Sequence, residues 1–437
     1  MDQDTSVVLL GLGEEFRCLS AIEQDGTLVV LVETTATVVA CRACGVIAKP
    51  KDRRTVLVQD LEWGDRPGVL AWKKRVWCCK EELCPAKTWT ETSDAIGVRA
   101  ALTERARADV CAQVANGSPV AVQARRFGVG WETAMNAVRD HGQPLVDDPG
   151  RIGEVDALGI DETSMAKATP DAPTRYVTGL VNARTGQLIE VLDGHDGATV
   201  RDWLAAQDPA WVGAIGVVTI DLSDTYAAGC RPHLDHATLV ADPFHVAQLG
   251  GKALDGIRRR VQQRDLGHRG RKDDPLYKIR KILRCRADGL DARGWARMWG
   301  VLNSSADARD ELTEAWQVYQ HLLGVYDAVG VKEGALRLDA VIAEAAGTGI
   351  DELVTLAKTL TKWRARILAR HATGASNGRA EATNLQIKNT KRIGRGFSNF
   401  ENYRLRLLLS HGMKPADKLR PPAAKPLRAK GPRRKAA

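Results

Sequence analysis

The order of apolar runs between Glu154 and Val246 restricts the fold of this chain more than any other feature. The segments EVDALGIDET, TRYVTGLVNA and GQLIEVLDG read as three successive strands, and ATVRDWLAAQ reads as a helix. AIGVVTIDLS is then a fourth strand, followed by a short helix from Thr225, a fifth strand in ATLVADPFH and a long helix. The chain therefore contains an α/β domain in which helices alternate with strands only after the third strand.

This order is typical of a ribonuclease H-like α/β domain, whose first part we expect at 152–249. Asp161 and Asp221 come at the ends of the first and fourth strands, where the chain leaves the sheet and loops build sites. The two strands are neighbours in this topology, so both carboxylates would lie side by side. A strand-end Asp taken singly is more often a turn former or a helix N-cap, so the prediction depends on the pair.

A third carboxylate from a later helix would complete an oxygen-rich site, which suits Mg²⁺. Two ions about 3.5 to 4 Å apart activate an attacking water or 3′-hydroxyl and stabilise the leaving oxygen in phosphodiester cleavage and strand transfer. Asp242, at another strand end in DPFH, is a candidate supporting residue or spare ligand. The pattern therefore predicts metal-dependent phosphodiester chemistry.

One late carboxylate, Glu381, stands among five cations in NGRAEATNLQIKNTKRIGR, residues 377–395. Its i+4 neighbour is Leu385, so ordinary pairing along a helix does not explain it. A helix beginning near Ala380 would align one stripe of side chains, namely Glu381, Asn384, Lys388, Arg392 and Arg395. The acid would then head a basic ridge.

After Val246 the strand signal disappears and long amphipathic helices take over, so we expect an all-helical insertion at 250–373. The final part of the catalytic core is expected at 374–412. The basic, glycine-punctuated loop RDLGHRGRKDDP either contacts DNA or is solvated. Aromatic side chains of the insertion form i,i+4 pairs that favour core contacts over base stacking, namely Trp295 with Trp299 and Leu312 with Trp316.

The nine cysteines divide by spacing, and in a chain without a secretion signal they do not predict a disulfide framework. Cys41 and Cys44 form CRAC, and Cys79 and Cys84 follow after 34 intervening residues in WCCKEELCP. Strand-like sequence flanks both pairs, which predicts a zinc-ribbon-like domain at 1–98 with four thiolates around a structural ion. Cys78 competes for the site, and free buried thiols are the alternative to zinc. The solitary cysteines are expected to be small buried apolar residues: Cys18, Cys111, Cys230 and Cys285.

From Leu102 to Gly142 the sequence is helical, with a break at Gly128 between two short helices. This fits a helix-turn-helix domain at 99–146, in which Gly128 permits a positive φ and Trp131–Arg139 forms the recognition helix. Any αα-hairpin with a glycine turn gives a similar pattern, but the neighbouring zinc module favours DNA. The candidate DNA contacts are Arg125, Arg126, Trp131, Thr133 and Asn136.

A chain of 437 residues with 44% hydrophobic side chains predicts a globular protein of several domains. No stretch reaches the ~18 uninterrupted apolar residues of a membrane-spanning helix and the first residues lack a cationic signal region, so we expect a cytoplasmic protein. The tail at 413–437 contains nine Lys or Arg against Asp417, which accounts for most of the net charge of +9. We expect it to be disordered and either to bind DNA or to aid solubility.

Together these blocks resemble the DDE transposases of bacterial insertion sequences, specifically the ISL-three family. The resemblance rests on CRAC with RVWCCKEELCPAKTWTE, the helix-turn-helix, GIDETS with TIDLSDTY and VADPFHV, and SNGRAEATNLQIKNTKRIGRGFSNFENYRLRLLL. It spans Cys41 to about Leu409. Two features depart from the family's pattern: the doubled cysteine at 78–79, where we prefer Cys79 as the ligand, and the basic extension after Met413.

The resemblance implies a ribonuclease H-like fold interrupted by the helical insertion, with zinc and helix-turn-helix modules that recognise terminal inverted repeats. It implies that the catalytic triad and ligands of two Mg²⁺ ions, or Mn²⁺, are Asp161, Asp221 and Glu381. The expected supporting residues are Asp242, His245 and Asn384, and the expected phosphate-binding residues are Lys388, Lys391, Arg392 and Arg395.

We therefore expect a DNA transposase that hydrolyses a phosphodiester at each element end and joins the freed 3′-hydroxyls to target DNA at the bacterial nucleoid. Its partners would be double-stranded DNA and further copies of the chain, because two DNA ends must be handled together in a dimer or larger assembly. Two alternatives stay open: a DNA-binding regulator with an inactive nuclease-like domain, and a structure-selective nuclease of the same fold.

Overall fold

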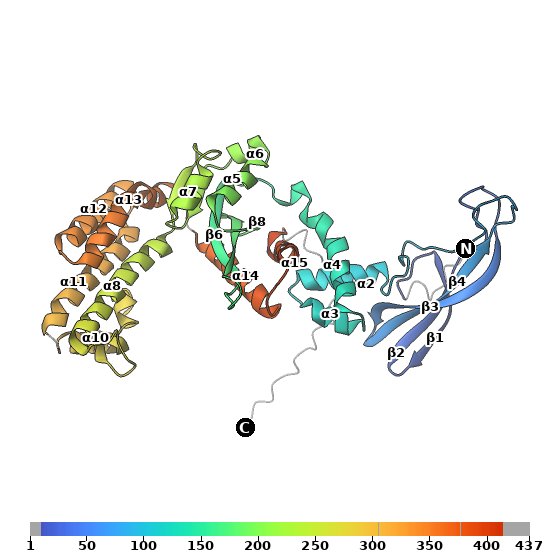
Figure 1. Ribbon diagram of the computed structural model, residues 1–437, viewed down its shortest axis with the longest axis horizontal. Helices are drawn as coiled ribbons and strands as arrows, with labels where there is room; N and C mark the ends of the chain where they lie inside the picture. The colour runs from blue at the N-terminus through green and yellow to red at the C-terminus, as the bar shows by residue number, and fades with distance from the viewer. Residues whose placement is uncertain (1–9, 305, 376, 414–437) are drawn as a thin grey trace, which may run out of the picture. The chain divides into compact units, whose positions relative to one another are not determined.

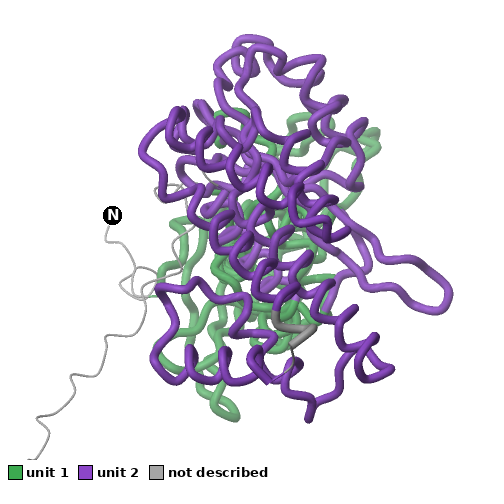
Figure 2. The backbone as a smooth tube through the Cα atoms, turned by 90° about the vertical axis from the view of Figure 1, so that its left-hand side faces the viewer, with its two compact units in different colours: residues 1–151, 392–395, 401–437 green, residues 152–391, 396–400 purple. Residues whose placement is uncertain are grey.

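The computed structural model describes residues 10–304, 306–375 and 377–413, which form two compact units (Figures 1 and 2). Unit 1 consists of residues 1–151, 392–395 and 401–437, and unit 2 of residues 152–391 and 396–400. The basic tail predicted at 413–437 lies, apart from its first residue, outside the described residues.

A mixed sheet, with both antiparallel and parallel strand pairs, forms the first part of unit 1. Its strand order is β1-β2-β4-β3, with β5 paired to the end of β4, and β2 runs parallel to β4. Phe16 and Trp72 meet edge to face at the centre of its apolar core, with ring centroids 6.0 Å apart. The strands are β1 (Phe16–Gln24), β2 (Thr27–Thr34), β3 (Lys49–Trp63), β4 (Arg66–Cys78) and β5 (Thr88–Thr90).

A helical subdomain completes unit 1. Thr103 caps its first helix by accepting a hydrogen bond from the backbone N–H of Ala106. A late segment of the chain packs on these helices: a Cβ at Gly142 would lie 2.7 Å from Cδ1 of Leu409, so a larger residue there would require the Leu409 side chain to move. The helices are α2 (Glu104–Ala115), α3 (Val120–Arg126), α4 (Trp131–Val146), the 3₁₀ turn η1 (Pro149–Arg151), α15 (Phe400–Leu407) and the π-helix η5 (Leu408–Gly412).

The structure therefore divides the segment expected to finish the catalytic core, 374–412. Residues from 401 onward belong to unit 1, because Tyr403, Leu405 and Leu408 are buried and η5 contacts both α2 and α4. Packing against the helical subdomain removes the apolar side chains of this segment from water, which is favourable.

Unit 2 contains a second sheet, with strand order β10-β9-β6-β7-β8. Within this sheet, β6, β7 and β8 pair as antiparallel neighbours, whereas β9 and β10 run parallel to β6. The first and fourth strands are adjacent, as the sequence predicted. The strands are β6 (Ala157–Ala166), β7 (Arg175–Asn182), β8 (Leu188–Asp193), β9 (Val217–Ile220) and β10 (Thr238–Ala241), and the connecting helices are α5 (Gly197–Ala205), α6 (Pro209–Gly213) and α7 (Asp224–Cys230).

Helices make up the rest of unit 2, and the described residues between 243 and 373 contain no strand. Trp295 and Trp299 both pack edge-on against Trp316, so these aromatic rings are core contacts, as expected. The helices are α8 (Pro243–Leu266), α9 (Pro275–Lys278), η2 (Ile282–Arg284), η3 (Ala287–Gly289), α10 (Ala292–Leu302), α11 (Ala306–Gly324), η4 (Val325–Asp327), α12 (Gly330–Gly347), α13 (Asp351–Thr373) and α14 (Gly378–Ile393).

The helical region is packed against the sheet as well as against itself. Helix α13 contacts β10, and α8, which begins directly after β10, contacts both α11 and α13. One continuous apolar core joins sheet residues such as Ile160 and Ile220 to Leu360 and Trp363 of α13. The end of the sheet at which α8 begins is thus packed against the helical bundle visible in Figure 1.

Within the described ranges, the combination of length and apolar character that a membrane crossing requires is not found in any helix.

Candidate active site and cysteine cluster

Strand register brings Asp161 and Asp221 to neighbouring positions. Parallel pairing of β6 with β9 runs as far as Ile160 opposite Ile220. Asp161 and Asp221 are the next residues along the chain after this pair. Asp221 follows the end of β9, as predicted. Asp161 instead lies inside β6, which corrects its predicted place at a strand end, because β6 continues to pair with β7 up to Ala166.

Helix α14 carries Glu381 in its first turn and lies against the sheet. Its close approach depends on Gly159, where an added Cβ would lie 3.3 Å from Ala380. Asn377, just before the helix, is buried and accepts a hydrogen bond of 2.9 Å from the hydroxyl of Thr219 on β9. Burial raises the pKa of Glu381, and the nearby carboxyl of Asp242 raises it further.

His245 is in direct contact with both Asp242 and Asp221. Nδ1 of His245 lies 2.8 Å from Oδ2 of Asp242 and 2.9 Å from Oδ1 of Asp221. The three side chains offer ligand atoms that all lie within 4.8 Å of one another. Burial lowers the pKa of His245, but the two carboxylates outweigh it and raise the pKa to about 10.

Asp161 lies beside this group and is positioned by α14. Burial raises the pKa of Asp161 to about 7 and the charge of Asp221 adds to the effect, although the backbone N–H of Glu162 and the cations His245 and Lys388 oppose it. Asn384 is buried and donates a hydrogen bond from Nδ2 to Oδ2 of Asp161. Four sequence segments thus converge on one group of carboxylates: β6, the end of β9, the start of α8 and α14.

The composition of this group fits a divalent cation. In the described part of the chain, Oε1 of Glu381 is a buried oxygen without a hydrogen-bond partner, and the buried Oδ1 of Asp221 lies 2.9 Å from Nδ1 of His245. Buried carboxylates whose pKa is raised by one another cost free energy unless a proton or a cation neutralises them. Carboxylate oxygens are the ligands that Mg²⁺ and Mn²⁺ prefer. The residues that could hold such an ion are Asp161, Asp221 and Glu381, with Asp242 and His245 adjoining them.

The cations predicted to follow Glu381 along α14 have different environments. Lys388 and Arg392 are exposed, whereas the ammonium of Lys391 donates to the hydroxyl of Ser164 on β6 at 3.2 Å and to its carbonyl. Arg395 does not continue the stripe: α14 ends at Ile393 and Arg395 has φ 55°. The predicted ridge is therefore shorter than the sequence suggested, because the chain turns before Gly396.

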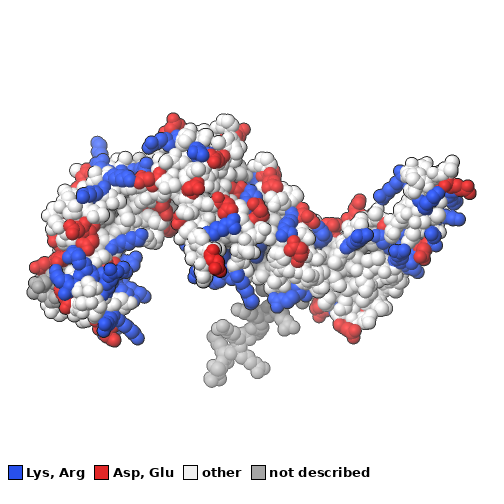
Figure 3. All heavy atoms as spheres, viewed as in Figure 1, with Lys and Arg blue, Asp and Glu red and all other residues white. Residues whose placement is uncertain are grey.

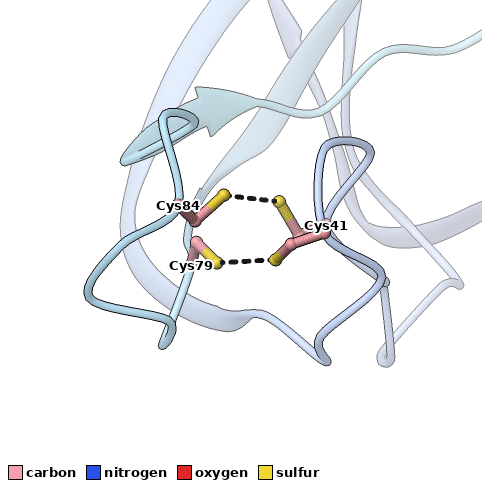
Figure 4. Close-up of side chains that lie close together, drawn as sticks. Cys41, Cys79 and Cys84 are labelled. Atoms are coloured by element: carbon pink, nitrogen blue, oxygen red, sulfur yellow. Dashed lines mark hydrogen bonds between the residues drawn. The ribbon is translucent and has the colours of Figure 1, made fainter.

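Four cysteines converge at one end of the unit 1 sheet (Figure 4). Cys41 and Cys44 lie in the loop after β2, and Cys79 and Cys84 lie between β4 and β5. The sulfur of Cys41 is 3.7 Å from that of Cys84, and the sulfur of Cys44 is 3.5 Å from that of Cys79. A tetrahedral ion with ligands at ~2.3 Å separates its sulfurs by about 3.8 Å. The cluster therefore fits a zinc ribbon.

The backbone around Cys41 favours the thiolate form of that cysteine. Backbone N–H groups of Ala43 and Cys44 hydrogen-bond to the sulfur of Cys41 and lower its pKa to about 7. Burial raises the pKa of Cys84, so this thiol needs a cation nearby to ionise. Cys78, the competing residue, is not part of the group, and its thiol faces the carbonyl of Cys79 instead. Cys111 and Cys230 are buried, as expected, but Cys285 is exposed and Cys18 is half-buried.

The five residues predicted to contact DNA from the helix-turn-helix divide into two groups. Arg126 forms an ion pair with the buried carboxylate of Asp109 and another with Glu62 at 3.2 Å, so its guanidinium is held within unit 1. Helices α3 and α4 meet at Gly128, whose φ of 61° gives the predicted turn. The other four predicted contacts retain exposed or half-exposed side chains: Arg125, Trp131, Thr133 and Asn136.

Comparisons with known proteins show which chains this sequence and fold are similar to. The ISL-three (ISL3) family of DDE transposases, described as "Transposase", matches residues 158–407. The transposase for insertion sequence element IS1001 of Bordetella parapertussis is 27% identical over 397 residues, which cover 87% of this chain and 91% of that protein. The transposase for insertion sequence element IS1557 of Mycobacterium tuberculosis (strain ATCC 25618 / H37Rv) is 28% identical over 267 residues, covering 56% and 58%. The Drosophila P element transposase strand transfer complex aligns with TM-score 0.38 and 12% identity over 74% of this chain and 95% of that chain.

The match over more than half of the chain shows that this protein belongs to the ISL3 family of DDE transposases. It is a DNA transposase, and hence an enzyme. The family resemblance predicted from the sequence is confirmed.

Sequence reasoning missed several residues that build the site. Asn377, Thr219 and Ser164 fix α14 on the sheet through side-chain hydrogen bonds. Asn377 directly precedes the helix of Glu381, and this position next to a predicted catalytic helix was the one sequence signal that could have identified it. The other two look like ordinary strand residues until the helix is placed against them.

Proposed function

We propose that this transposase binds the terminal inverted repeats of its element, cleaves the DNA ends by metal-dependent hydrolysis and joins the 3′-hydroxyl ends to target DNA. The observation that carries the proposal is the convergence of Asp161, Asp221 and Glu381 in one group, in which the pKa of Asp161 and of Glu381 is raised and Oε1 of Glu381 is buried without a hydrogen-bond partner. The family's DDE designation agrees with this triad.

The proposed fold of the catalytic domain is ribonuclease H-like, with the helical segment inserted before α14. The strand order β10-β9-β6-β7-β8, with only the first three strands antiparallel, supports it. In unit 1 we assign the sheet with its cysteines to a zinc ribbon, and α2, α3 and α4 to a helix-turn-helix domain.

Two divalent cations, Mg²⁺ or Mn²⁺, would be held by Asp161, Asp221 and Glu381, where they would activate the attacking oxygen and neutralise charge on the leaving oxygen. Asn384 orients the carboxylate of Asp161 through its amide. His245, held by Asp242, donates toward Asp221 and limits the rotamers of that carboxylate. The protein residues thereby fix the ligands before DNA arrives, which reduces reorganisation during the reaction.

The chemistry would occur in two in-line displacements at phosphorus. Water oxygen bonds to phosphorus in the first, the bond from phosphorus to the 3′-oxygen breaks, and the strand is left with a 3′-hydroxyl and a 5′-phosphate. In the second, that hydroxyl bonds to a target phosphorus and displaces a target 3′-oxygen. The exposed cations Lys388 and Arg392 lie on the helix of Glu381 and would bind phosphates near the scissile bond.

The four-cysteine cluster would hold one structural Zn²⁺. A closed set of four thiolates leaves no position for water or substrate, so this ion would stabilise unit 1 without taking part in the reaction. The proposed ligands are Cys41, Cys44, Cys79 and Cys84, and the grouping of these four sulfurs without Cys78 supports Cys79 as the ligand.

DNA contacts in unit 1 would come from the helix-turn-helix. Trp131 has 46% of its surface exposed at the start of α4, and Asn136 is exposed further along the helix. Arg125 on α3 and Thr133 complete the candidate surface. Arg126 would act indirectly, by holding α3 against Asp109 of α2. A dimer or larger assembly acting on the bacterial nucleoid in the cytoplasm would handle the two DNA ends together.

A strand-transfer assay with candidate inverted repeats tests the proposed function. Purified protein with Mg²⁺ is expected to nick repeat-bearing DNA and to join its 3′-ends to a second duplex. Asp161→Asn and Glu381→Gln are each expected to abolish both products while leaving binding to the repeat intact. Cleavage that persists in both variants would contradict the assignment of the triad, and cleavage without joining would make the protein a nuclease.

A further inference from the structure

A second charged site lies in the helical part of unit 2. A pocket of about 440 Å³ is lined by the side of α8, the loop that follows it, α9 and η2. Six of the lining residues are cationic and one, Asp255, is acidic. Figure 3 shows Lys and Arg side chains gathered over the end of the bundle that carries α10, which packs against α9 and η2. The cationic lining residues are Arg258, Arg259, Arg269, Arg280, Lys281 and Arg284.

The floor of this pocket is built and rigid. Arg258 is 3% exposed, pairs with Asp255 at 2.7 Å and hydrogen-bonds to Gln262 one turn further along α8. Gly270 closes the loop onto it: its φ is 113°, and an added Cβ would lie 2.7 Å from Gln262 and 3.1 Å from Arg258. Only glycine allows so close an approach in this backbone conformation.

An aromatic ring orders two of the guanidinium groups. Arg280 stacks over the ring of Tyr277 at 3.9 Å from its centroid and also donates to the carbonyl of that residue. Arg258 lies on the same ring at 5.7 Å. Stacking holds the planar fork of a guanidinium in one orientation, with N–H groups directed outward in the geometry that binds a phosphate with two hydrogen bonds.

Asp255 and Asp274, the two acids that contact groups of the pocket, are already occupied, whereas most of the pocket's cations are not. Asp255 is shared by Arg258 and Arg259, and Asp274 at the end of the loop accepts from Gln262 and lies beside His268. Across residues 10–304, 306–375 and 377–413, no ion pair is formed by the remaining lining cations, Arg269, Arg280, Lys281 and Arg284, or by the loop cations Arg271 and Lys272. Uncompensated like charges gathered around a pocket favour a polyanionic ligand.

We propose that this pocket binds the phosphodiester backbone of duplex DNA held by the same subunit, at a distance from the catalytic carboxylates. The inference rests on the proposed function, because it takes DNA as the ligand. Helix α8 begins at the carboxylate group and carries Arg258 thirteen residues beyond His245, which corresponds to about 20 Å along the helix axis. A duplex lying along α8 would reach the pocket about six base pairs from the scissile phosphate.

The salt dependence of DNA binding tests the proposal. In the full-length protein, Arg269, Lys281 and Arg284 are replaced together by Ala, since all three are exposed and none supports the floor. The matched control replaces Arg231, Lys332 and Lys358 by Ala, which are exposed cations elsewhere in unit 2 and outside the pocket. The probe is a linear DNA duplex of mixed sequence, with sodium tripolyphosphate as a second probe.

Loss of three phosphate contacts is expected to make the plot of log affinity against log salt shallower by about 2.7 for the pocket variant. The control variant is expected to keep the wild-type slope, and all three proteins are expected to share one Tm. Equal slopes for the pocket variant and wild type would overturn the proposal, as would an equal decrease in the control. Tripolyphosphate binding lost in the pocket variant with an unchanged DNA slope would also overturn it, because the pocket would then take a small polyphosphate.

This outcome is separable from failure of the proposed catalytic site. Asp161→Asn removes a carboxylate of the active site and no lining residue of the pocket, so it is expected to lose cleavage and keep the wild-type salt slope. The pocket variant is expected to keep cleavage at low salt, where affinity is high. If Asp161→Asn still cleaves DNA while the pocket variant shows the shallower slope, the triad assignment fails and the pocket proposal stands.

Discussion

The cysteine cluster of unit 1 and the carboxylate group of unit 2 are assembled in opposite ways. The four sulfurs come from two loops and already lie at separations close to those around a tetrahedral ion, 3.5 and 3.7 Å for the two closest pairs. The carboxylates come from segments as distant as Asp161 and Glu381, and they meet only through sheet register and the packing of α14. The sulfur site is closed and suits a structural role, whereas the oxygen site leaves Oε1 of Glu381 buried without a hydrogen-bond partner.

The two groups also differ in whether nearby residues take part in them. Cys78 is adjacent to a cluster member and takes no part in it, because its side chain points to the carbonyl of Cys79. His245, by contrast, contacts Asp221 from the start of another helix, where it is also bound to Asp242. A catalytic metal site needs such outer partners to orient its carboxylates, and a four-thiolate site is oriented by backbone N–H groups of its own loops.

The largest expected effect concerns the cysteine cluster. Cys44→Ser is expected to release zinc and to lower Tm by about 10 °C or more, because binding of Zn²⁺ to a structural site contributes about 10 kcal/mol to folding. Cys78→Ser provides the matched control, since it changes the adjacent cysteine outside the group. Zinc content by atomic absorption and Tm by calorimetry are the measurements. Loss of zinc from Cys78→Ser alone would reverse the ligand assignment.

The next effect concerns the carboxylates. Asp161→Asn is expected to reduce the rate of Mg²⁺-dependent cleavage about 1000-fold, or about 4 kcal/mol, because the triad loses a charged ligand. Asp224→Asn is the control, since Asp224 is an exposed acid that pairs with Lys362 at the surface of the same unit. Single-turnover cleavage measures the rate, with Tm as a check on folding. Equal rates in the two variants would remove Asp161 from the active site and break the comparison.

A smaller effect is expected from the residue that orients Asp161. Asn384→Ala removes the buried amide that donates to that carboxylate and is expected to slow cleavage about 10- to 100-fold, as other partners of metal ligands do. The Mg²⁺ concentration required for half-maximal rate is also expected to rise in this variant. Gln386→Ala alters an exposed residue two positions further on the same helix and should leave both quantities unchanged. An unchanged metal dependence in Asn384→Ala would mean that Asp161 is oriented by other groups.

The smallest effect is expected from the exposed cation nearest the carboxylates. Lys388→Ala is expected to slow cleavage no more than about fivefold at low salt, with the difference disappearing at high salt, because exposed charges interact weakly and are screened. Lys332→Ala, on α12, gives the reference for losing one exposed charge. A loss from Lys388→Ala as large as that from Asp161→Asn would place the ammonium among the reacting groups.

Much of the carboxylate site could be anticipated from residues, and the part that could not has a common cause. The order of strands predicted that the first and fourth would be neighbours, and the register of β6 with β9 places Asp161 beside Asp221. The length of β6 was not predictable, because Ala166 is in a strand only through its pairing with β7. Arg395 was assigned to the helical stripe, but the chain adopts a left-handed conformation there.

Charged residues were the hardest to assign from sequence. Arg125 and Arg126 are adjacent and equally basic, yet one is exposed and the other is paired with buried Asp109. Likewise, Lys391 is bound to Ser164 while Lys388, one turn earlier, is exposed. Helical periodicity specifies which face a side chain occupies, but the partner on that face comes from another segment.

By itself, the sequence determined the features that depend on local spacing: the four cysteines, the glycine turn at Gly128, the order of strands and helices, and the family. Only the tertiary structure decided the contact of His245 with Asp221, the packing of Leu409 on the helical subdomain, and the basic pocket around Arg258. The physical reason is that these contacts join segments far apart in the chain, so their formation depends on which surfaces pack together and not on any local pattern.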